Sequence, residues 1–209
     1  MGYMRHYTFL RNHHHKTSSV GLYGFQKYVL LHIGLESNKL MCLLVSQLLS
    51  QAMSAADKFQ QSSEAYYIDE AINVDRAALE LCTPGHPLRS ACLFQLGLHL
   101  SARYKVFGGV ETLNEAILLS RGALGLRSRG HPDRSSSLIN LAAGLATRYN
   151  PPGGIEDLNE AILLDRDALR LRPPGHPLRS SSLNNLAVHL ATRYNLVGGL
   201  PSSFFRQPC

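Results

Sequence analysis

The chain has 209 residues, of which 44% are hydrophobic and 17% are charged, and its formal net charge is +6. This composition is typical of a folded protein and excludes the collagen-like and intrinsically disordered classes. The four cysteines include no CxxC pair and have no disulfide-dense spacing, so we expect a reducing, cytoplasmic compartment.

Residues 1–40 are a poorly defined basic segment, since residues 1–62 carry six Lys or Arg against two Asp or Glu. The apolar stretch 28–49 is long enough to suggest a membrane span, but the polar residues 36–39 (ESNK) interrupt it. Two short helices joined by a polar turn fit this pattern better, so we expect no membrane partner. Three consecutive histidines at 13–15 are interpreted as a solvated tail.

Residues 41–200 are predicted to form one helical repeat domain, because anchor residues recur every 45 positions. Residues 113–154 and 158–199 are identical at 31 of 42 aligned positions. One copy of such a unit cannot bury its apolar face alone, so repetition indicates stacking. The repeats span about 43–86, 87–131, 132–176 and a partial 177–200, followed by a non-repeat tail at 201–209. The degenerate first copy keeps Leu48, Ala52 and Phe59.

Each unit is predicted to contain two helices. In the last unit one apolar stripe recurs at helical spacing, formed by Leu183, Leu186, Ala187, Leu190 and Tyr194. A Gly-Gly pair and a Gly-His-Pro motif separate successive helices, since glycine ends a helix and proline suits the first turn of the next. The predicted fold class is therefore all-α, an α-α superhelix of about 3.5 helical hairpins.

The stretches "SLNNLAVHLATRY" and "LNEAILLDRDALRLRPPGHP" resemble tetratricopeptide repeats, in particular the long repeats of kinesin light chains. Paired alanines of that family's second helix are matched by Ala71 and Ala78, Ala116 and Ala123, and Ala161 and Ala168. The aromatic residue between them is replaced by Asp75, Ser120 and Asp165. Because the period is longer than usual, a HEAT-like or armadillo-like solenoid is the alternative fold. Tandem "GHPxRSSSLxNLA" copies also resemble repeat arrays of fungal CHAT-domain proteins.

The resemblance implies a concave groove, lined by the first helix of each unit, that binds a peptide segment of a partner protein. The residues expected there are Phe94, Gln95, Leu98, Ile139, Asn140, Ala143, Asn184, Asn185 and Val188, with small neighbours such as Ser101, Ala102 and Thr147. The amides of Gln95, Asn140 and Asn185 occupy equivalent positions and either bind a peptide backbone or tie neighbouring helices together. We expect no lysine in this groove, which favours a neutral or amphipathic peptide.

Two arginine series recur with the repeat, formed by Arg89, Arg134 and Arg179 and by Arg103, Arg148 and Arg193. We expect them to pack and to cap carbonyl groups rather than to bind acidic ligands. The repeated His86, His131 and His176 lie too far apart on adjacent helices to share a metal ion, so no metal or cofactor is expected. No phosphate loop, GxSxG or HExxH motif is present, and we expect no enzymatic activity.

The predicted function is a protein-interaction scaffold. The final first helix, near 178–194, lacks a second helix in the sequence, so either Phe204 and Phe205 fold back on it or its apolar stripe drives self-association. The alternatives are therefore a self-assembly scaffold or a truncated fragment of a larger repeat array, and then a basic nucleic-acid-binding protein. The last is less favoured, because the repeats interleave both signs of charge. Gly122 and Gly125 are expected to weaken the second helix of their unit.

Overall fold

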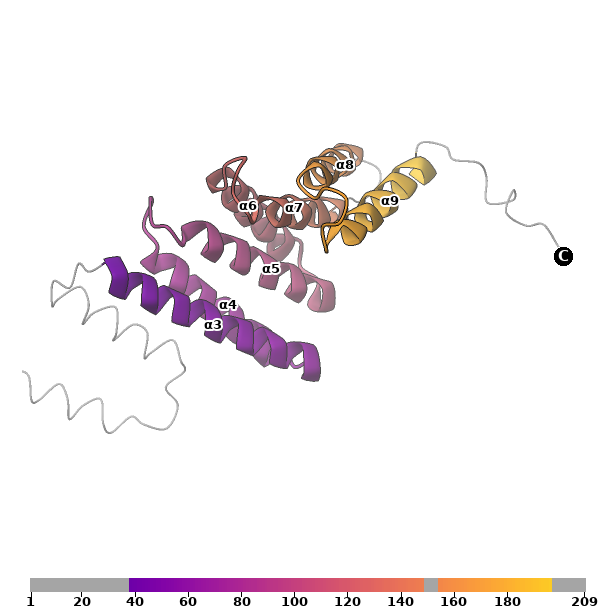
Figure 1. Cartoon of the computed structure of the whole chain (residues 1–209). Helices are drawn as coiled ribbons and strands as arrows, with labels where there is room; N and C mark the ends of the chain where they lie inside the picture. The colour runs from indigo at the N-terminus through magenta and orange to yellow at the C-terminus, as the bar shows by residue number, and fades with distance from the viewer. Residues whose placement is uncertain (1–37, 149–153, 197–209) are drawn as a thin grey trace, which may run out of the picture. The chain divides into compact units, whose positions relative to one another are not determined.

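A computed structural model describes residues 38–148 and 154–196, which contain seven α-helices and no strand (Figure 1). The helices are α3 (Asn38–Ser62), α4 (Ala65–Leu81), α5 (Arg89–Phe107), α6 (Val110–Leu126), α7 (Arg134–Arg148), α8 (Ile155–Arg170) and α9 (Arg179–Leu196). Two compact units divide the chain at Cys92, within α5, and each is described by itself. Within them α3 packs on α4, and α6, α7 and α8 each pack on the next helix. The expected all-α, sequentially packed helical architecture is confirmed.

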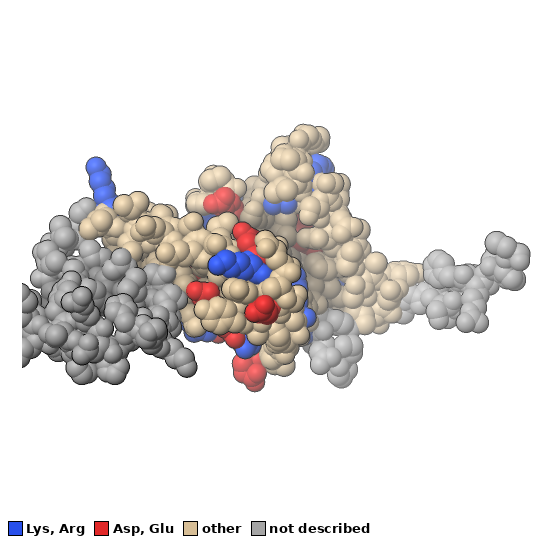
Figure 2. Space-filling view, turned by 90° about the horizontal axis from the view of Figure 1, so that it is seen from below, with Lys and Arg blue, Asp and Glu red and all other residues tan. Residues whose placement is uncertain are grey.

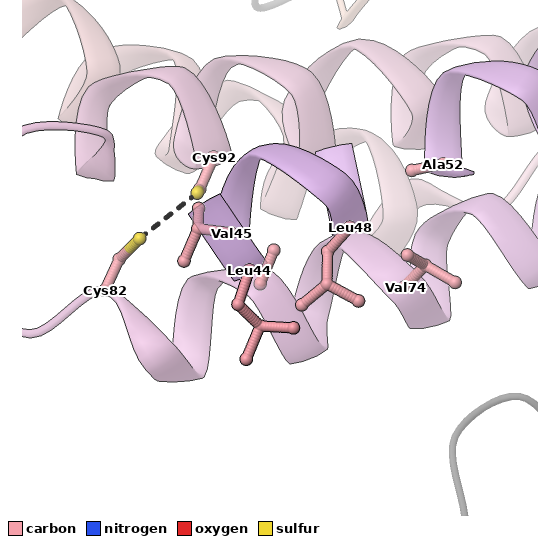
Figure 3. Packing of buried hydrophobic residues seen from close by; sticks show 8 residues of the cluster. Leu44, Val45, Leu48, Ala52, Val74, Cys82 and Cys92 are labelled. Carbon is pink, nitrogen blue, oxygen red and sulfur yellow. Dashed lines mark hydrogen bonds between the residues drawn. The ribbon is translucent and has the colours of Figure 1, made fainter. Parts of the chain in front are cut away.

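In the first unit α3 and α4 lie side by side and are joined by only Ser63 and Glu64. Ser63 has a positive φ of 56°, the left-handed conformation that allows the chain to reverse within two residues. Figure 3 shows the core between them, formed by Leu44, Val45, Leu48, Ala52, Val74, Ala78, Cys82 and Cys92. The residues that identified the degenerate first copy, Leu48, Ala52 and Phe59, are all buried.

Helix α3 is the one helix of the described residues that has the length and apolar composition to cross a membrane. Core helices of folded domains meet the same criterion, and α3 buries Val45, Leu48 and Ala52 in the hairpin core. It begins at Asn38, within the polar stretch 36–39 that was expected to interrupt the apolar run. The predicted helix before that stretch lies outside the described residues.

The predicted apolar stripe of the last repeat lies on α9, where Leu183, Ala187 and Tyr194 are exposed and Leu186 and Leu190 are half-buried, because no second helix covers that face in the described residues. The equivalent stripe of the preceding repeat is the buried face of α7. Leu138, Leu141 and Leu145 are at most 3% exposed and pack between α6 and α8. Their cluster joins three helices and contains Leu113, Ile117, Leu141, Ala142, Leu145 and Ala161. The small residues at the alanine positions allow close helix contact, since a Cβ on Gly97 of α5 would come within 3.2 Å of the Ala116 carbonyl oxygen of α6.

The Gly-His-Pro motifs form the turns between sequence repeats, as predicted. The backbone N–H groups of His86, His131 and His176 each donate to the carbonyl oxygen three residues earlier at 3.0 Å. The ring Nδ1 of each histidine then accepts the N–H two residues later, at 3.2 Å from Leu88, 3.1 Å from Asp133 and 3.1 Å from Leu178. Each imidazole therefore occupies a hydrogen-bonding position that fixes the first turn of the next helix.

Candidate peptide-binding groove

A pocket of about 120 Å³ lies between α5 and α7, with α6 contributing one residue. Leu98, Asn140 and Ala143, three of the expected groove residues, line it. The complete lining is Leu98, Ser101, Ala102, Tyr104, Lys105, Leu113, Asn140, Ala143, Gly144 and Thr147. The pocket therefore lies on the faces of the two first helices that the resemblance to tetratricopeptide repeats assigned to a groove.

The size of the pocket limits its ligand. Sites for drug-sized molecules and cofactors have volumes of about 300–1,000 Å³. The observed volume of about 120 Å³ is less than half of the lower end of that range. It is therefore suited to one side chain of a larger partner rather than to a whole cofactor.

The hydroxyl groups beside the pocket donate to their own helices. Ser101 Oγ donates to the Gly97 carbonyl oxygen at 2.9 Å, and Thr147 Oγ1 donates to the Ala143 carbonyl oxygen at 2.7 Å. Because each hydroxyl donates its single hydrogen to its own helix, its oxygen can only accept a hydrogen bond from a ligand. The side chains of Leu98 and Ala143 add apolar surface, so the pocket combines acceptor oxygens with aliphatic walls.

The expectation that the groove contains no lysine is wrong. Lys105 lines the pocket and its side chain is exposed. It lies seven residues after Leu98 on α5, a spacing that places both on one helix face. The residue 45 positions later is Asn150 and the next is Asn195, so only this unit has a cation at this position. The pocket can therefore attract a carboxylate or a carbonyl oxygen of a ligand.

The other expected groove residues of the second unit lie outside the pocket lining. Phe94, Gln95 and Ile139 are half-buried on α5 and α7. The Arg127 guanidinium lies 4.7 Å from the centre of the Phe94 ring, so Phe94 supports a buried arginine. On α9, Asn184 and Val188 are exposed and Asn185 is half-buried, and none of the three lines the pocket.

Asn140 has a structural contact as well as a place at the pocket. Its Nδ2 donates to Ser120 Oγ at 3.1 Å, which joins α7 to α6. Ser120 in turn donates to the Ala116 carbonyl oxygen at 2.8 Å. One N–H of the Asn140 amide therefore ties two helices together, which is the structural role weighed for these amides. The carbonyl oxygen of its amide is an additional acceptor.

The first arginine series caps carbonyl groups, as expected. Arg89, Arg134 and Arg179 each donate through Nη1 to the backbone carbonyl oxygen seven residues earlier, at the end of the preceding helix. Arg134 and Arg179 also donate to Leu124 and Leu169 at 3.3 and 3.4 Å. These guanidinium groups neutralise helix C-termini, where carbonyl oxygens lack intrahelical donors.

Arg148, from the second series, forms a two-point ion pair with Asp157 of α8. Both N–H···O distances are 2.7 Å. The hydrogen bond from Arg148 lowers the pKa of the Asp157 carboxyl below its ordinary value, more than burial raises it. Arg121 of α6 forms a similar pair with Glu160 of α8, at 2.6 Å. These arginines therefore tie neighbouring helices together.

Sequence reasoning missed two kinds of buried polar contact, an Arg–Ser pair that occurs twice and an Asp–His pair. Arg127 and Arg172 are 3% exposed and donate to Ser137 Oγ at 2.7 Å and Ser182 Oγ at 2.8 Å. Burial lowers the pKa of both guanidinium groups, because their charged form loses hydration. The signal was present in the sequence, since both arginines precede their serine partners by ten residues, 45 positions apart.

The second missed contact joins α8 to α9. Asp165, which is fully buried, lies with its Oδ2 2.7 Å from His189 Nδ1. Asp165 lies on α8 between the buried Ala161 and Ala168. A carboxylate there needs a hydrogen-bond partner, and His189 supplies it.

The charge distribution bears on the nucleic-acid alternative. On the face shown in Figure 2, Lys and Arg side chains alternate with Asp and Glu side chains and form no single basic patch. Among the described residues, no group of three or more His, Cys, Asp or Glu side chains could hold a metal ion. Neither observation assigns a nucleic-acid or metal site to this part of the chain.

No protein-family model, no curated protein and no solved structure matches the chain. The internal repeat and the contacts described above are therefore the basis for a functional proposal.

Proposed function

We propose that this protein is a protein-interaction scaffold of the tetratricopeptide type, which binds a peptide segment of a partner along the first helices of its repeats. The observation that supports this proposal is the pocket between α5 and α7, since Leu98, Asn140 and Ala143 were expected there from the resemblance to tetratricopeptide repeats. The helical hairpins and their small-residue contacts fit the same family.

The ligand is an extended peptide that places one aliphatic side chain in the pocket. Its volume of about 120 Å³ and its walls of Leu98, Ala102 and Ala143 select a side chain of medium size. Lys105 and the amide of Asn140 then bind backbone carbonyl oxygens or an acidic neighbour of that side chain. This revises the ligand expected from sequence, from neutral or amphipathic to apolar with an adjacent negative group.

The test is selection from a library of random peptides displayed on phage, using the full chain as bait. Enriched peptides should share an aliphatic residue next to Asp, Glu or a free C-terminus. Ala143→Leu fills the pocket and should weaken their binding by at least about tenfold, about 1.4 kcal/mol of binding free energy. Ala65→Leu, at an exposed position of α4, is the matched control and should bind normally.

The amides are tested separately. Asn140→Ala combined with Asn185→Ala should reduce peptide binding while circular dichroism retains the helical signal. Equal binding by wild type, Ala143→Leu and the double amide variant would reject the groove.

A second candidate is self-assembly through α9. Leu183 is 45% exposed, whereas Leu138, its equivalent in α7, is 3% exposed. The cover that α8 gives to α7 is absent from this face of α9 in the described structure, so a helix from a second copy could replace it. The expected fold-back of Phe204 and Phe205 concerns residues outside those described.

A further inference from the structure

In the first unit two cysteines contact one histidine, and a third cysteine contacts one of these two. Cys82 ends α4, and Cys92 lies in the first turn of α5. Their sulfur atoms are 3.4 Å apart, the contact drawn as a dashed line in Figure 3. Cys82 Sγ also lies 3.3 Å from His86 Nδ1, and Cys42 Sγ lies 3.7 Å from His86 Nε2. All three thiols are free.

The other repeats show that this pair is a replacement of a structural contact. Cys82 stands where Arg127 and Arg172 stand in the following units, and Cys92 stands where Ser137 and Ser182 stand. Those positions form the buried Arg–Ser hydrogen bonds described above. In the first unit two thiols therefore occupy the positions that a buried guanidinium and its hydroxyl acceptor occupy in the later repeats.

We propose that Cys82 and Cys92 form an oxidisable dithiol, which hydrogen peroxide converts to an intramolecular disulfide. The site requires a small oxidant, because both cysteines are 0% exposed and a bulky disulfide reagent cannot reach them. Cys82 Sγ contacts the half-buried ring of His86. Forming the bond brings the sulfur atoms about 1.4 Å closer, from 3.4 Å to the usual length of about 2.05 Å.

The surroundings make Cys82 the attacking group. The hydrogen bond from Cys92 and the charge of Arg89 lower the pKa of the Cys82 thiol, against the effect of burial. The pKa of Cys92 is raised, mainly by its hydrogen bond to Cys82, so Cys92 keeps its proton while Cys82 reacts. His86 Nδ1 accepts the N–H of Leu88, so in the neutral tautomer the ring proton is on Nε2, toward Cys42 Sγ.

The reaction balances in two steps. The Cys82 thiolate attacks one oxygen of hydrogen peroxide, the O–O bond breaks, and the departing hydroxide takes up the proton lost from Cys82 to form water. Cys92 then attacks the sulfur of the Cys82 sulfenic acid, the S–O bond breaks, and the hydroxide takes the Cys92 proton as a second water. Each sulfur loses one electron, and the peroxide gains two.

A metal ion is the competing use of such a cluster. Nδ1 and Nε2 of His86 point in opposite directions, so Cys42 and Cys82 cannot share one ion with that ring. No group of three such ligands in the described residues could hold a metal. The short contact between two thiols of different pKa therefore favours oxidation.

The test uses the full chain with all its cysteines. The native protein is treated with equimolar hydrogen peroxide, its remaining thiols are blocked with N-ethylmaleimide in denaturant, and it is digested with trypsin without reductant. Cleavage after Arg76, Arg89 and Arg103 separates Cys82 on 77–89 from Cys92 on 90–103, while Cys42 lies on 40–58. We expect 77–89 and 90–103 to be linked, with a mass about 2 Da below the sum of the reduced peptides, since two hydrogen atoms leave.

Two variants separate a built site from chance oxidation. Cys42→Ser should leave the link intact. Cys82→Arg combined with Cys92→Ser reproduces the Arg127–Ser137 contact, so it should keep the helical signal and lose the link. The proposal is overturned if both peptides carry N-ethylmaleimide, if Cys82 is found as sulfinic or sulfonic acid, if Cys82 is linked to Cys42, or if the link forms only in urea.

Discussion

Arg127 and Arg172 show how a single side chain can hold a turn between repeats. Each guanidinium leaves the end of a second helix and reaches a serine in the next first helix, while also donating to a backbone carbonyl oxygen in between. Arg172 reaches Ser135 as well, at 3.2 Å. A buried charge with several hydrogen bonds is costly to disturb, because removing it leaves its acceptors unpaired.

Arg127→Ala should therefore destabilise the protein by about 2–4 kcal/mol, since it unpairs Ser137 and opens space beside Phe94. Urea unfolding followed by circular dichroism measures this free energy. Arg129→Ala, at an exposed position two residues later, is the control and should change stability by less than about 0.5 kcal/mol. Similar losses for both variants would contradict a structural role for Arg127.

The Arg148–Asp157 pair predicts a pH dependence. The folded-state pKa of Asp157 is depressed, so the pair contributes stability above the unfolded-state value of about 3.9 and loses it as pH falls through the folded-state value. Asp157→Asn should lower the free energy of unfolding by about 0.5–1 kcal/mol at pH 7, a modest effect because solvent screens the partly exposed Arg148. The difference from wild type should vanish toward pH 2. A difference that persists there would show that the hydrogen bonds, and not the charge, stabilise the pair.

The role of a residue could be predicted where the same residue recurs in every unit. Arg89, Arg134 and Arg179 recur unchanged, and their capping contacts were expected. Arg127 was not predicted, because burial of a guanidinium depends on a serine ten residues away that looks unremarkable in a serine-rich helix start. Lys105 was overlooked because it occurs in one unit only.

At the scale of helices, the Gly-His-Pro and Gly-Gly punctuation predicted the boundaries well. Gly108 and Gly109 have φ values of 72° and 99°, which glycine adopts without strain. The start of α3 was predicted less accurately, since α3 begins at Asn38 whereas the repeat register placed the start of the first repeat at about 43. The repeat pattern includes only residues that recur every 45 positions, whereas α3 begins earlier, with residues outside the pattern such as Met41.

Helix α6 contains two interior glycines, Gly122 and Gly125, and is expected to be the weak helix of its unit. Gly125→Ala should stabilise the protein by up to about 1 kcal/mol, since a Cβ there meets nothing within 4 Å and glycine is a poor helix former. Thermal unfolding and hydrogen exchange across 110–126 measure the effect. Exchange in α6 should be faster than in α8 and should slow in the variant.

The matched control is Gly85→Ala. Its site is equally open, but its φ of +90° strains any residue with a Cβ, so this variant should be less stable than wild type. Stabilisation by both substitutions would show that space alone, and not backbone conformation, decides their effect.

At the scale of the molecule, the repeat predicted an all-α chain of stacked hairpins, because periodic apolar residues are enough to define helix faces. It could not predict the pocket volume or the buried Asp165–His189 contact, which depend on how side chains from successive repeats pack against one another. These packing details differ between units that share most of their sequence.

The exposed face of α9 predicts concentration-dependent association. Leu183→Gln combined with Leu190→Gln should shift light-scattering masses toward the monomer, since polar side chains remove the apolar contact. Peptide binding to the pocket between α5 and α7 should persist in this variant. A wild-type chain that stays monomeric at every concentration would reject the self-assembly candidate and leave the peptide groove untouched.

The Arg–Ser contacts also determine where such a chain can be recombined. Each contact crosses a Gly-His-Pro turn, so a chimera joined at His131 separates Arg127 from the Ser137 with which it bonds. A junction at Gly108–Gly109 keeps every such pair, and the Cys82–Cys92 pair, within one parental segment. The exchangeable module therefore begins with a second helix and ends with the first helix of the next unit, half a period away from the boundary that the sequence repeat suggests.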